Sequence, residues 1–495
     1  MMLYPSLKEA AQYLEKYPVT PVFYEVLSDT YTPIYIYHTL ARTEETCFIL
    51  ESVDHAQQWG RYSFIGIAPK AEIKVKNGTI TTVQNGITKT LQTQNPLAYL
   101  QELLQQYRSP HFPDQPKLTG GLIGYFAYDT VRYAEPTVNC PPTDDLDMPD
   151  CHLFLYDEII AFDHLHNKTV IILNLNRQGN LAAQYQSCSK RAKEIAQLLQ
   201  HAAPAPAYSP AQKELIVRSN ISKQAFIQMV EQAKTYIQNG DIFQIVLSQR
   251  FEVENPPEPF AVYRMLRASN PSPYLYYFKH RNYQIAGASP EMLVNVTDGI
   301  VSTKPIAGTI GRGSTEQEDA QLEQQLLHDP KEHAEHTMLV DLGRNDVGKI
   351  AKFGTVEVTD LMHIERYSKV MHLVSNVKGL LREDKTTLDA LAAVLPAGTL
   401  SGAPKVRAMQ LIDQLENRRR GLYGGTVGYL AFDGNMDTCI AIRTVLFKEN
   451  KAYVQAGAGI VADSVPEKEY AETQHKALAV INAMKDAAHL EEELL

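Results

Sequence analysis

Two Asn-Gly dipeptides within residues 71–92 place the strongest local constraint on how this chain folds. The stretch reads AEIKVKNGTITTVQNGITKTLQ, and apolar residues alternate with polar ones on both sides of Asn77-Gly78 and Asn85-Gly86. Asn-Gly favours the tight turn that joins two antiparallel strands, and alternation is typical of a strand with one buried face. The stretch therefore predicts consecutive antiparallel strands.

Similar runs, bounded by turn residues, recur over the first 200 residues, where helices are expected at 95–107 and 181–201. The segment 201–213, HAAPAPAYSPAQK, is rich in Pro and Ala and lacks helical periodicity, which indicates a linker. We therefore expect an N-terminal domain over 1–200 and a second domain over 214–495.

Beyond the linker, helical patterns alternate with strand patterns. Helices are expected at 222–240, 315–346, 386–395, 403–416 and 467–494, and strands at 241–254, 274–280, 283–290, 425–432, 437–450 and 451–461. The predicted class is α+β (mixed α/β), with large, mainly antiparallel sheets packed together and flanked by helices.

Composition excludes several classes of protein. The chain has 495 residues, of which 44% are hydrophobic, so it can bury a large core. Its net charge of -10 argues against nucleic-acid binding, and its apolar runs are too short for a membrane span or a signal peptide. Five cysteines without CxxC spacing predict neither a disulfide framework nor structural zinc, which favours the cytoplasm.

Two Glu-x-x-Glu pairs stand out among the charged residues. Glu332 and Glu335 lie in HDPKEHAEHTMLVDLGRND, and Glu469 and Glu472 lie in DSVPEKEYAETQHKA. In each pair the carboxylates share one face near the start of a helix, where like charges repel. Two matched pairs of carboxylates indicate a divalent-cation site, and Mg²⁺ fits best because it prefers oxygen ligands. Taken alone, either pair could merely complement a helix dipole, and HAEH lacks the HExxH order of a zinc enzyme.

Ten ordered blocks over roughly residues 220–485 resemble the chorismate-utilising enzyme family. They read GDIFQIVLSQRF, NPSPYLYYF, GASPEMLV, TKPIAGTIGRG, EHTMLVDLGRND, YSKVMHLVS, GTLSGAPKVRAM, YGGTVGY, CIAIRT and AGAGIVADSVPEKEYAET. The resemblance implies that family's fold and an enzyme that acts on chorismate with Mg²⁺.

Two positions indicate which reaction the resemblance implies. Relatives that add water carry a Lys base where this chain has Gln244, and a neutral amide cannot take a proton from water, whereas ammonia is already a nucleophile. Aminodeoxychorismate synthases typically carry a Lys nucleophile where this chain has Ala307. The resemblance thus implies the branch that makes anthranilate and pyruvate from chorismate and ammonia, the first step of tryptophan biosynthesis.

The resemblance also implies roles for individual residues. Glu335 and Glu472 would hold the metal directly, with Glu332 and Glu469 acting through metal-bound water. Glu291 resembles the general acid that protonates the leaving hydroxyl at C4, with His372 beside it; the base of the second step is either His372 or a metal-site carboxylate. The expected chorismate contacts are Gly308, Thr309, Tyr429, Arg443, Gly457, Ala458, Gly459 and Lys476.

A feedback site for tryptophan is implied in the N-terminal half. Leu50, Glu51 and Ser52 resemble the family's Leu-Glu-Ser motif. The family's second motif for the inhibitor, NPSPYM, is matched by NPSPYL at 270–275, where Leu275 replaces Met and conserves volume. The expected inhibitor contacts are Glu51, Ser52, Asn270, Pro271, Ser272 and Tyr274.

A partner subunit is expected because the chain lacks the parts of a glutaminase. Cys439 lies in an apolar, strand-like run and no GxCxG elbow occurs, so ammonia must come from a separate glutamine amidotransferase subunit, in a heterotetramer. Three alternatives stay open: an aminodeoxychorismate synthase, an isochorismate-type hydratase that uses water, and a catalytically silent amino-acid-sensing subunit.

Overall fold

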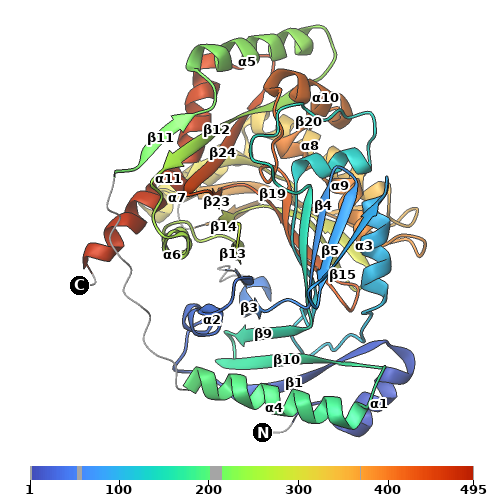
Figure 1. Ribbon diagram of the computed structural model, residues 1–495. Coiled ribbons are helices and arrows are strands. Elements are labelled where there is room, and N and C mark those ends of the chain that lie inside the picture. Colours follow the sequence, from blue (N-terminus) through green and yellow to red (C-terminus); the bar gives the residue numbers. More distant parts are fainter. Residues whose placement is uncertain (1–2, 53–57, 201–213, 368–369, 494–495) are drawn as a thin grey trace.

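The computed structural model describes residues 3–52, 58–200, 214–367 and 370–493, so the expected linker at 201–213 lies outside the described residues. Two large sheets dominate the molecule, each with twelve strands, and their paired strands run antiparallel. Helices flank both sheets (Figure 1). The predicted class, α+β with large antiparallel sheets, is confirmed.

The first sheet combines strands from both halves of the chain. In spatial order it contains β1 (Val19–Leu27), β10 (Lys168–Asn176), β9 (Glu158–Asp163), β3 (Tyr62–Ile67), β2 (Cys47–Glu51), β13 (Tyr274–His280), β14 (Tyr283–Ser289), β23 (Thr444–Lys448), β24 (Lys451–Ile460), β12 (Gln244–Glu254) and β11 (Ile216–Ser219), with β20 (Gly402–Ala403) on β12. The halves join where β2 pairs with β13.

The second sheet is shared in the same way. Its order is β17 (Ile306–Gly311), β19 (Val370–Leu380), β16 (Ile300–Thr303), β15 (Met292–Thr297), β22 (Met436–Ile440), β21 (Thr426–Ala431), β7 (Gly121–Phe126), β8 (Cys151–Tyr156), β4 (Ala71–Lys76), β5 (Thr79–Gln84) and β6 (Ile87–Gln92), with β18 (Glu357–Arg366) on β19. Here the halves join where β7 pairs with β21.

The Asn-Gly prediction is confirmed. Asn77 and Gly78 join β4 to β5, Asn85 and Gly86 join β5 to β6, and all four have the positive φ that this turn requires.

Side chains from both sheets meet in a common core. The ring of Phe48 on β2 lies 4.8 Å from that of Tyr156 on β8, centroid to centroid, so the two sheets pack face to face there. The outer face of the first sheet packs against α4 (Leu181–Gln200), α6 (Pro259–Ser269) and α11 (Pro466–Glu493), and that of the second against α8 (Pro330–Gly348) and α9 (Thr387–Val394). The remaining helices are α1 (Leu7–Lys16), α2 (Pro33–Ala41), α3 (Pro96–Gln105), α5 (Lys223–Gln238), α7 (Glu316–Leu327), α10 (Lys405–Glu416), η1 (Gln58–Arg61), η2 (Tyr128–Tyr133) and η3 (Gly398–Leu400).

Two sequence expectations need correction. The helix expected over 315–346 is broken into α7 and α8 at Asp329-Pro330, because Asp329 caps α8 and Pro330 cannot continue α7. The strand expected over 437–450 is two strands, β22 in the second sheet and β23 in the first.

Candidate active site

The chain crosses from one sheet to the other at two points that matter for the site. Between β14 and β15 it passes from the first sheet to the second, and Glu291 lies on this crossing. Between β22 and β23 it returns, and Arg443 lies there with a φ of 49°. A positive φ outside glycine stores strain, which is typical of functional positions. Both residues therefore lie where the chain passes from one sheet to the other.

Glu291 is a buried carboxyl group with a raised pKa. Burial raises the pKa of Glu291 to about 7, although a hydrogen bond and the charges of Lys476 and Arg443 oppose the shift. The hydrogen bond comes from Thr399, whose Oγ1 lies 2.9 Å from Oε1 of Glu291. A carboxyl with a pKa near neutrality can donate a proton at the pH of the cell.

His372 lies on β19, which pairs with β17, the strand that contains Gly308 and Thr309. Burial lowers the pKa of His372, and Arg443 lowers it further. Its Nδ1 lies 3.3 Å from the carbonyl oxygen of Gly308 and 2.9 Å from Oγ1 of Thr309. Because a carbonyl can only accept, Nδ1 carries the proton, and Nε2 is left as the basic nitrogen.

Two glycine segments line the site. Gly308 has a φ of +62°, and a Cβ there would lie 3.0 Å from Oε2 of Glu332 and 2.9 Å from a Leu326 methyl. A Cβ on Gly457 would lie 2.6 Å from the hydroxyl of Tyr423. Only glycine fits at these positions, where backbone groups stay open to close approach.

The glutamate pairs start two helices beside these glycines. Glu332 and Glu335 lie in the first turns of α8, and Glu469 and Glu472 in those of α11. Burial raises the pKa of Glu332 and Glu469, and the neighbouring carboxylate of each pair raises it further. Among the described residues, no three of these glutamates have carboxylate oxygens that all lie within 4.8 Å of one another. The glutamates therefore form two pairs rather than one tight cluster.

Lys476 and Gln244 connect the pairs to the rest of the site. Nζ of Lys476 lies 2.7 Å from Glu472 and donates to the carbonyl of Gly457 at 3.2 Å. Nε2 of Gln244, on β12, donates to Oε1 of Glu335 at 3.3 Å. Oε1 of Gln244 is buried and has no partner within the described residues. Because Glu335 can only accept, the Gln244 amide is oriented with its oxygen available to a donor.

The structure thus brings together the predicted catalytic residues, the glutamate pairs and the expected chorismate contacts, except for Ala458 and Tyr429. The Ala458 side chain is fully buried in an apolar cluster against α5. Tyr429 lies on β21 and lines a separate cavity. Tyr423, in the same block YGGTVGY, contacts the Gly457 position instead. The sequence analysis missed Tyr423 and also Thr399; both lie in quoted blocks, but nothing in the sequence distinguishes the two tyrosines.

Three of the six expected inhibitor residues line an open cavity of about 1000 Å³. Glu51, Ser52 and Tyr274 line it, and the strand pairing places Glu51 opposite Leu275. Ser52 Oγ is buried without a partner in the described chain, whereas Glu51 accepts from Tyr263 at 2.5 Å and from Arg267 at 3.0 Å.

The other expected inhibitor residues shape the turn before β13. Ser272 Oγ donates to the carbonyl of Asn270 at 3.0 Å, and Asn270 caps the end of α6. Asn270, Pro271 and Ser272 are not among the residues that line the cavity.

Comparison with known proteins places the chain in a family. The model of the chorismate binding enzymes matches residues 45–482. The chain belongs to this family of chorismate-binding enzymes. Anthranilate synthase component 1 of Acetivibrio thermocellus is 50% identical over 99% of this chain and 100% of the relative, and that of Aquifex aeolicus is 43% identical over 100% of both.

Solved structures of the family agree with this fold. Anthranilate synthase component I from Streptococcus pneumoniae TIGR4 matches with a TM-score of 0.76 and 42% identity, covering 87% of this chain and 94% of that one. The menaquinone-specific isochorismate synthase of Escherichia coli has the same fold, with a TM-score of 0.69 at 20% identity. Within the described residues, no helix of this chorismate-binding enzyme is both long and apolar enough to cross a membrane.

Proposed function

We propose that this chain is the synthase subunit of an anthranilate synthase, which converts chorismate and ammonia to anthranilate and pyruvate in tryptophan biosynthesis. The observation that carries the proposal is the buried acid Glu291, with a pKa of about 7, close to the cations Arg443 and Lys476. An acid is needed because hydroxide is a poor leaving group, and the cations suit a dicarboxylate substrate.

The nucleophile is ammonia. Position 244 holds an amide rather than a basic Lys, and the buried Oε1 of Gln244 is available to accept a hydrogen bond from an N–H group. Position 307 holds a methyl group, which cannot form a covalent intermediate. These two positions disfavour the hydratase and the aminodeoxychorismate synthase.

The donor set fits Mg²⁺. All four candidate ligands are carboxylates, and mutual repulsion within each pair, seen as raised pKa values, would be relieved by a divalent cation. Glu335 and Glu472 would hold the ion directly, and Glu332 and Glu469 through water. Bound Mg²⁺ would neutralise the ring carboxylate of chorismate and orient it.

The residues then divide the reaction into two steps. Ammonia attacks C2 of chorismate while Glu291 protonates the leaving C4 hydroxyl. In the second step the proton on C2 is removed and pyruvate is expelled, which leaves the aromatic ring. The unprotonated Nε2 of His372 supports its role as the base, and a metal-site carboxylate is the alternative.

Regulation and ammonia supply extend the proposal. Tryptophan would bind in the cavity at Ser52 and Tyr274 and inhibit the enzyme. Ammonia would come from glutamine through a separate amidotransferase subunit, in a heterotetramer. The five cysteines are free thiols, which supports a cytoplasmic location.

The first experiment measures anthranilate fluorescence and pyruvate after the purified chain is mixed with chorismate, Mg²⁺ and ammonium. We expect equal amounts of both products, loss of activity with EDTA, and suppression by tryptophan. Chorismate consumed without pyruvate would indicate an aminodeoxychorismate synthase, and activity without ammonia would indicate a hydratase. No consumption would favour the silent sensor.

The inhibitor site has its own test. We expect Ser52→Ala to raise the tryptophan concentration for half inhibition about tenfold, since one good hydrogen bond is lost. Its kcat without tryptophan should stay unchanged. Unaltered inhibition in Ser52→Ala would place the tryptophan site elsewhere.

A further inference from the structure

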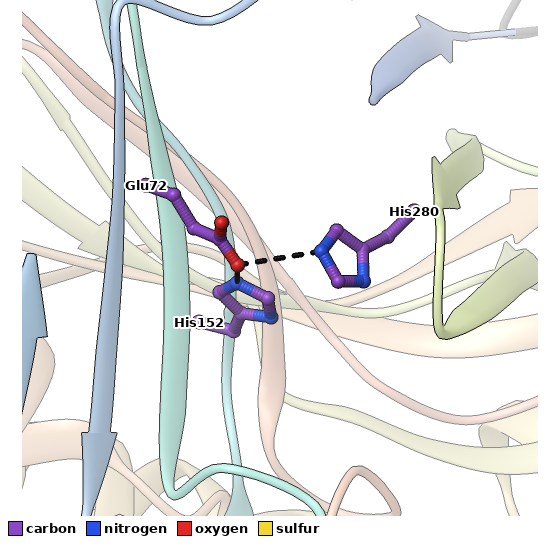
Figure 2. A group of neighbouring side chains, drawn as sticks. All are labelled: Glu72, His152 and His280. Carbon is purple, nitrogen blue, oxygen red and sulfur yellow. Dashed lines mark hydrogen bonds and ion pairs between the residues drawn. The ribbon is translucent and has the colours of Figure 1, made fainter. Parts of the chain in front are cut away.

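A second group of potential metal ligands lies away from the active site, where the two sheets meet. Glu72 on β4 and His152 on β8 belong to the second sheet, and His280 ends β13 of the first. Their ligand atoms all lie within 4.8 Å of one another. Figure 2 shows both imidazoles directed at one carboxylate oxygen, with Nε2 of His152 3.0 Å and Nε2 of His280 3.3 Å from Oε1 of Glu72.

The surroundings fix the two rings. The side chain of His152 is fully buried, and that of His280 is 2% exposed. Nδ1 of His152 lies 2.6 Å from the hydroxyl of the buried Tyr283 and accepts from it while Nε2 donates to Glu72; in a metal-bound form Nδ1 would carry the proton and the hydroxyl would accept it. Such a second hydrogen bond on the far ring nitrogen is the usual support of a metal-binding histidine.

The surroundings shift the pKa of two of the three side chains. Burial lowers the pKa of His152 to about 4, so this imidazole is neutral. Burial alone would raise the pKa of Glu72, but hydrogen bonds from His152, His280 and Lys74 outweigh it and hold the pKa well below its ordinary value. The group therefore offers two imidazole nitrogens and one carboxylate as ligand atoms.

A cation already lies against the carboxylate. Nζ of Lys74 is 2.5 Å from Oε1 of Glu72, and Nη2 of Arg281 is 3.7 Å from Oε2. Both side chains reach solvent, Lys74 with 27% and Arg281 with 54% of its side chain exposed. Lys74 can therefore leave Glu72 when a metal ion takes its place.

We propose that Glu72, His152 and His280 form a zinc-type metal site that ties the β13–β14 hairpin to the second sheet. Nitrogen donors favour zinc or a similar transition metal over Mg²⁺. The spacings of 3.0 and 3.3 Å are close to the roughly 3.3 Å between ligands in a tetrahedral zinc site with bonds of about 2.1 Å. A water molecule would complete the coordination.

Binding through Nε2 removes the contacts of both histidines with Glu72 and changes a further hydrogen bond at His280. Its Nδ1 now accepts the amide N–H of Asn282 at 3.3 Å, and it would carry a proton in the metal-bound form. The contact is long, and it is local to the hairpin turn. The metal thus replaces the two Nε2–H contacts with Glu72, the long Asn282 contact and the Lys74 ion pair with three ligand bonds.

The test uses the full-length chain without a histidine tag, titrated with Co²⁺ while excess Mg²⁺ occupies the carboxylate pairs. We expect one equivalent of Co²⁺ with the intense visible absorption of tetrahedral coordination, displaced by one equivalent of Zn²⁺. His280→Ala should weaken binding at least tenfold. His166→Ala is the matched control, since His166 also lies in a hairpin turn between strands and is 53% exposed.

Two further measurements separate a metal site from a purely structural hydrogen-bond network. Lys74→Ala should bind Co²⁺ several-fold more tightly, because the competing cation is removed, and Zn²⁺ should raise the Tm of the wild type but not of His280→Ala. Equal Co²⁺ uptake by wild type and His280→Ala, or weaker uptake by Lys74→Ala, would overturn the proposal. If His280→Ala unfolds, Glu72→Gln replaces it in the same comparison.

Discussion

At the scale of single residues, the site depends on opposite effects of burial on two groups. Burial raises the pKa of Glu291 to about 7, which favours its protonated form, and it lowers the pKa of His372, which favours the neutral imidazole. One group can then give a proton and the other can take one at the same pH. No bound metal is needed for this division.

The first prediction concerns pH. The protonated form of Glu291 is the active one, and its pKa is about 7. The value of kcat/KM should therefore be highest below pH 7 and fall as the pH rises through 7. The measurement is the initial rate of anthranilate formation between pH 5.5 and 9, at a constant concentration of unprotonated ammonia.

Thr399→Val is the control for that profile. The Thr399 hydroxyl lowers the pKa of Glu291, so its removal should move the falling limb to higher pH. Glu291→Gln should reduce kcat by roughly 10²–10⁴ and abolish the limb. A limb that stays in place in Thr399→Val would assign it to another group.

The sequence predicted which types of residue form the site, but it did not predict the position of every one of them. Glu291 and Arg443 were predicted from their blocks and lie close together, as the charge effect of Arg443 on Glu291 indicates. The sequence prediction named Tyr429 and not Tyr423, since the block YGGTVGY does not reveal which phenol faces the glycines. That choice depends on where β21 begins, and β21 begins at Thr426, after Tyr423.

At the scale of elements, the start of α8 sets the direction of two carboxylates. Asp329 caps the helix, with Oδ1 accepting from the backbone amides of Lys331 at 2.9 Å and Glu332 at 3.2 Å. Helical periodicity alone runs on through this point, so the sequence prediction missed the break. Pro330 was the signal, because proline cannot continue a preceding helix but suits the first position of a new one.

The second prediction tests this cap. Asp329→Ala should lower the free energy of unfolding by about 1 kcal/mol, since two amides lose their acceptor. It should also raise the Mg²⁺ concentration needed for half activity, because Glu332 and Glu335 lie in the loosened turns. Asp341→Ala, an exposed change on the same helix, should alter neither quantity measurably.

At the scale of the whole molecule, two sheets meet in one core. Alternating patterns predicted the strands, but strand partners far apart in sequence leave no local signal, so neither the pairing of β2 with β13 nor that of β7 with β21 could be predicted. The sequence prediction also missed that the chain passes from the second sheet to the first at 441–443, because the apolar run continues through these residues.

The third prediction concerns this core. Phe48 is fully buried between the sheets, against Tyr156 and Phe278, so Phe48→Ala should lower the free energy of unfolding by about 3–5 kcal/mol. Urea denaturation followed by circular dichroism measures this loss. Leu27→Ala, at a position 61% exposed, should change it by less than about 0.5 kcal/mol.

The shared sheets also limit how such a chain can be rearranged. Cutting it between residues 200 and 214 would separate β2 from β13 and β7 from β21, leaving each fragment with two incomplete sheets and four newly exposed strand edges in total. Each fragment would need the other to complete its two sheets. The N-terminal half therefore cannot be exchanged as an independently folding unit.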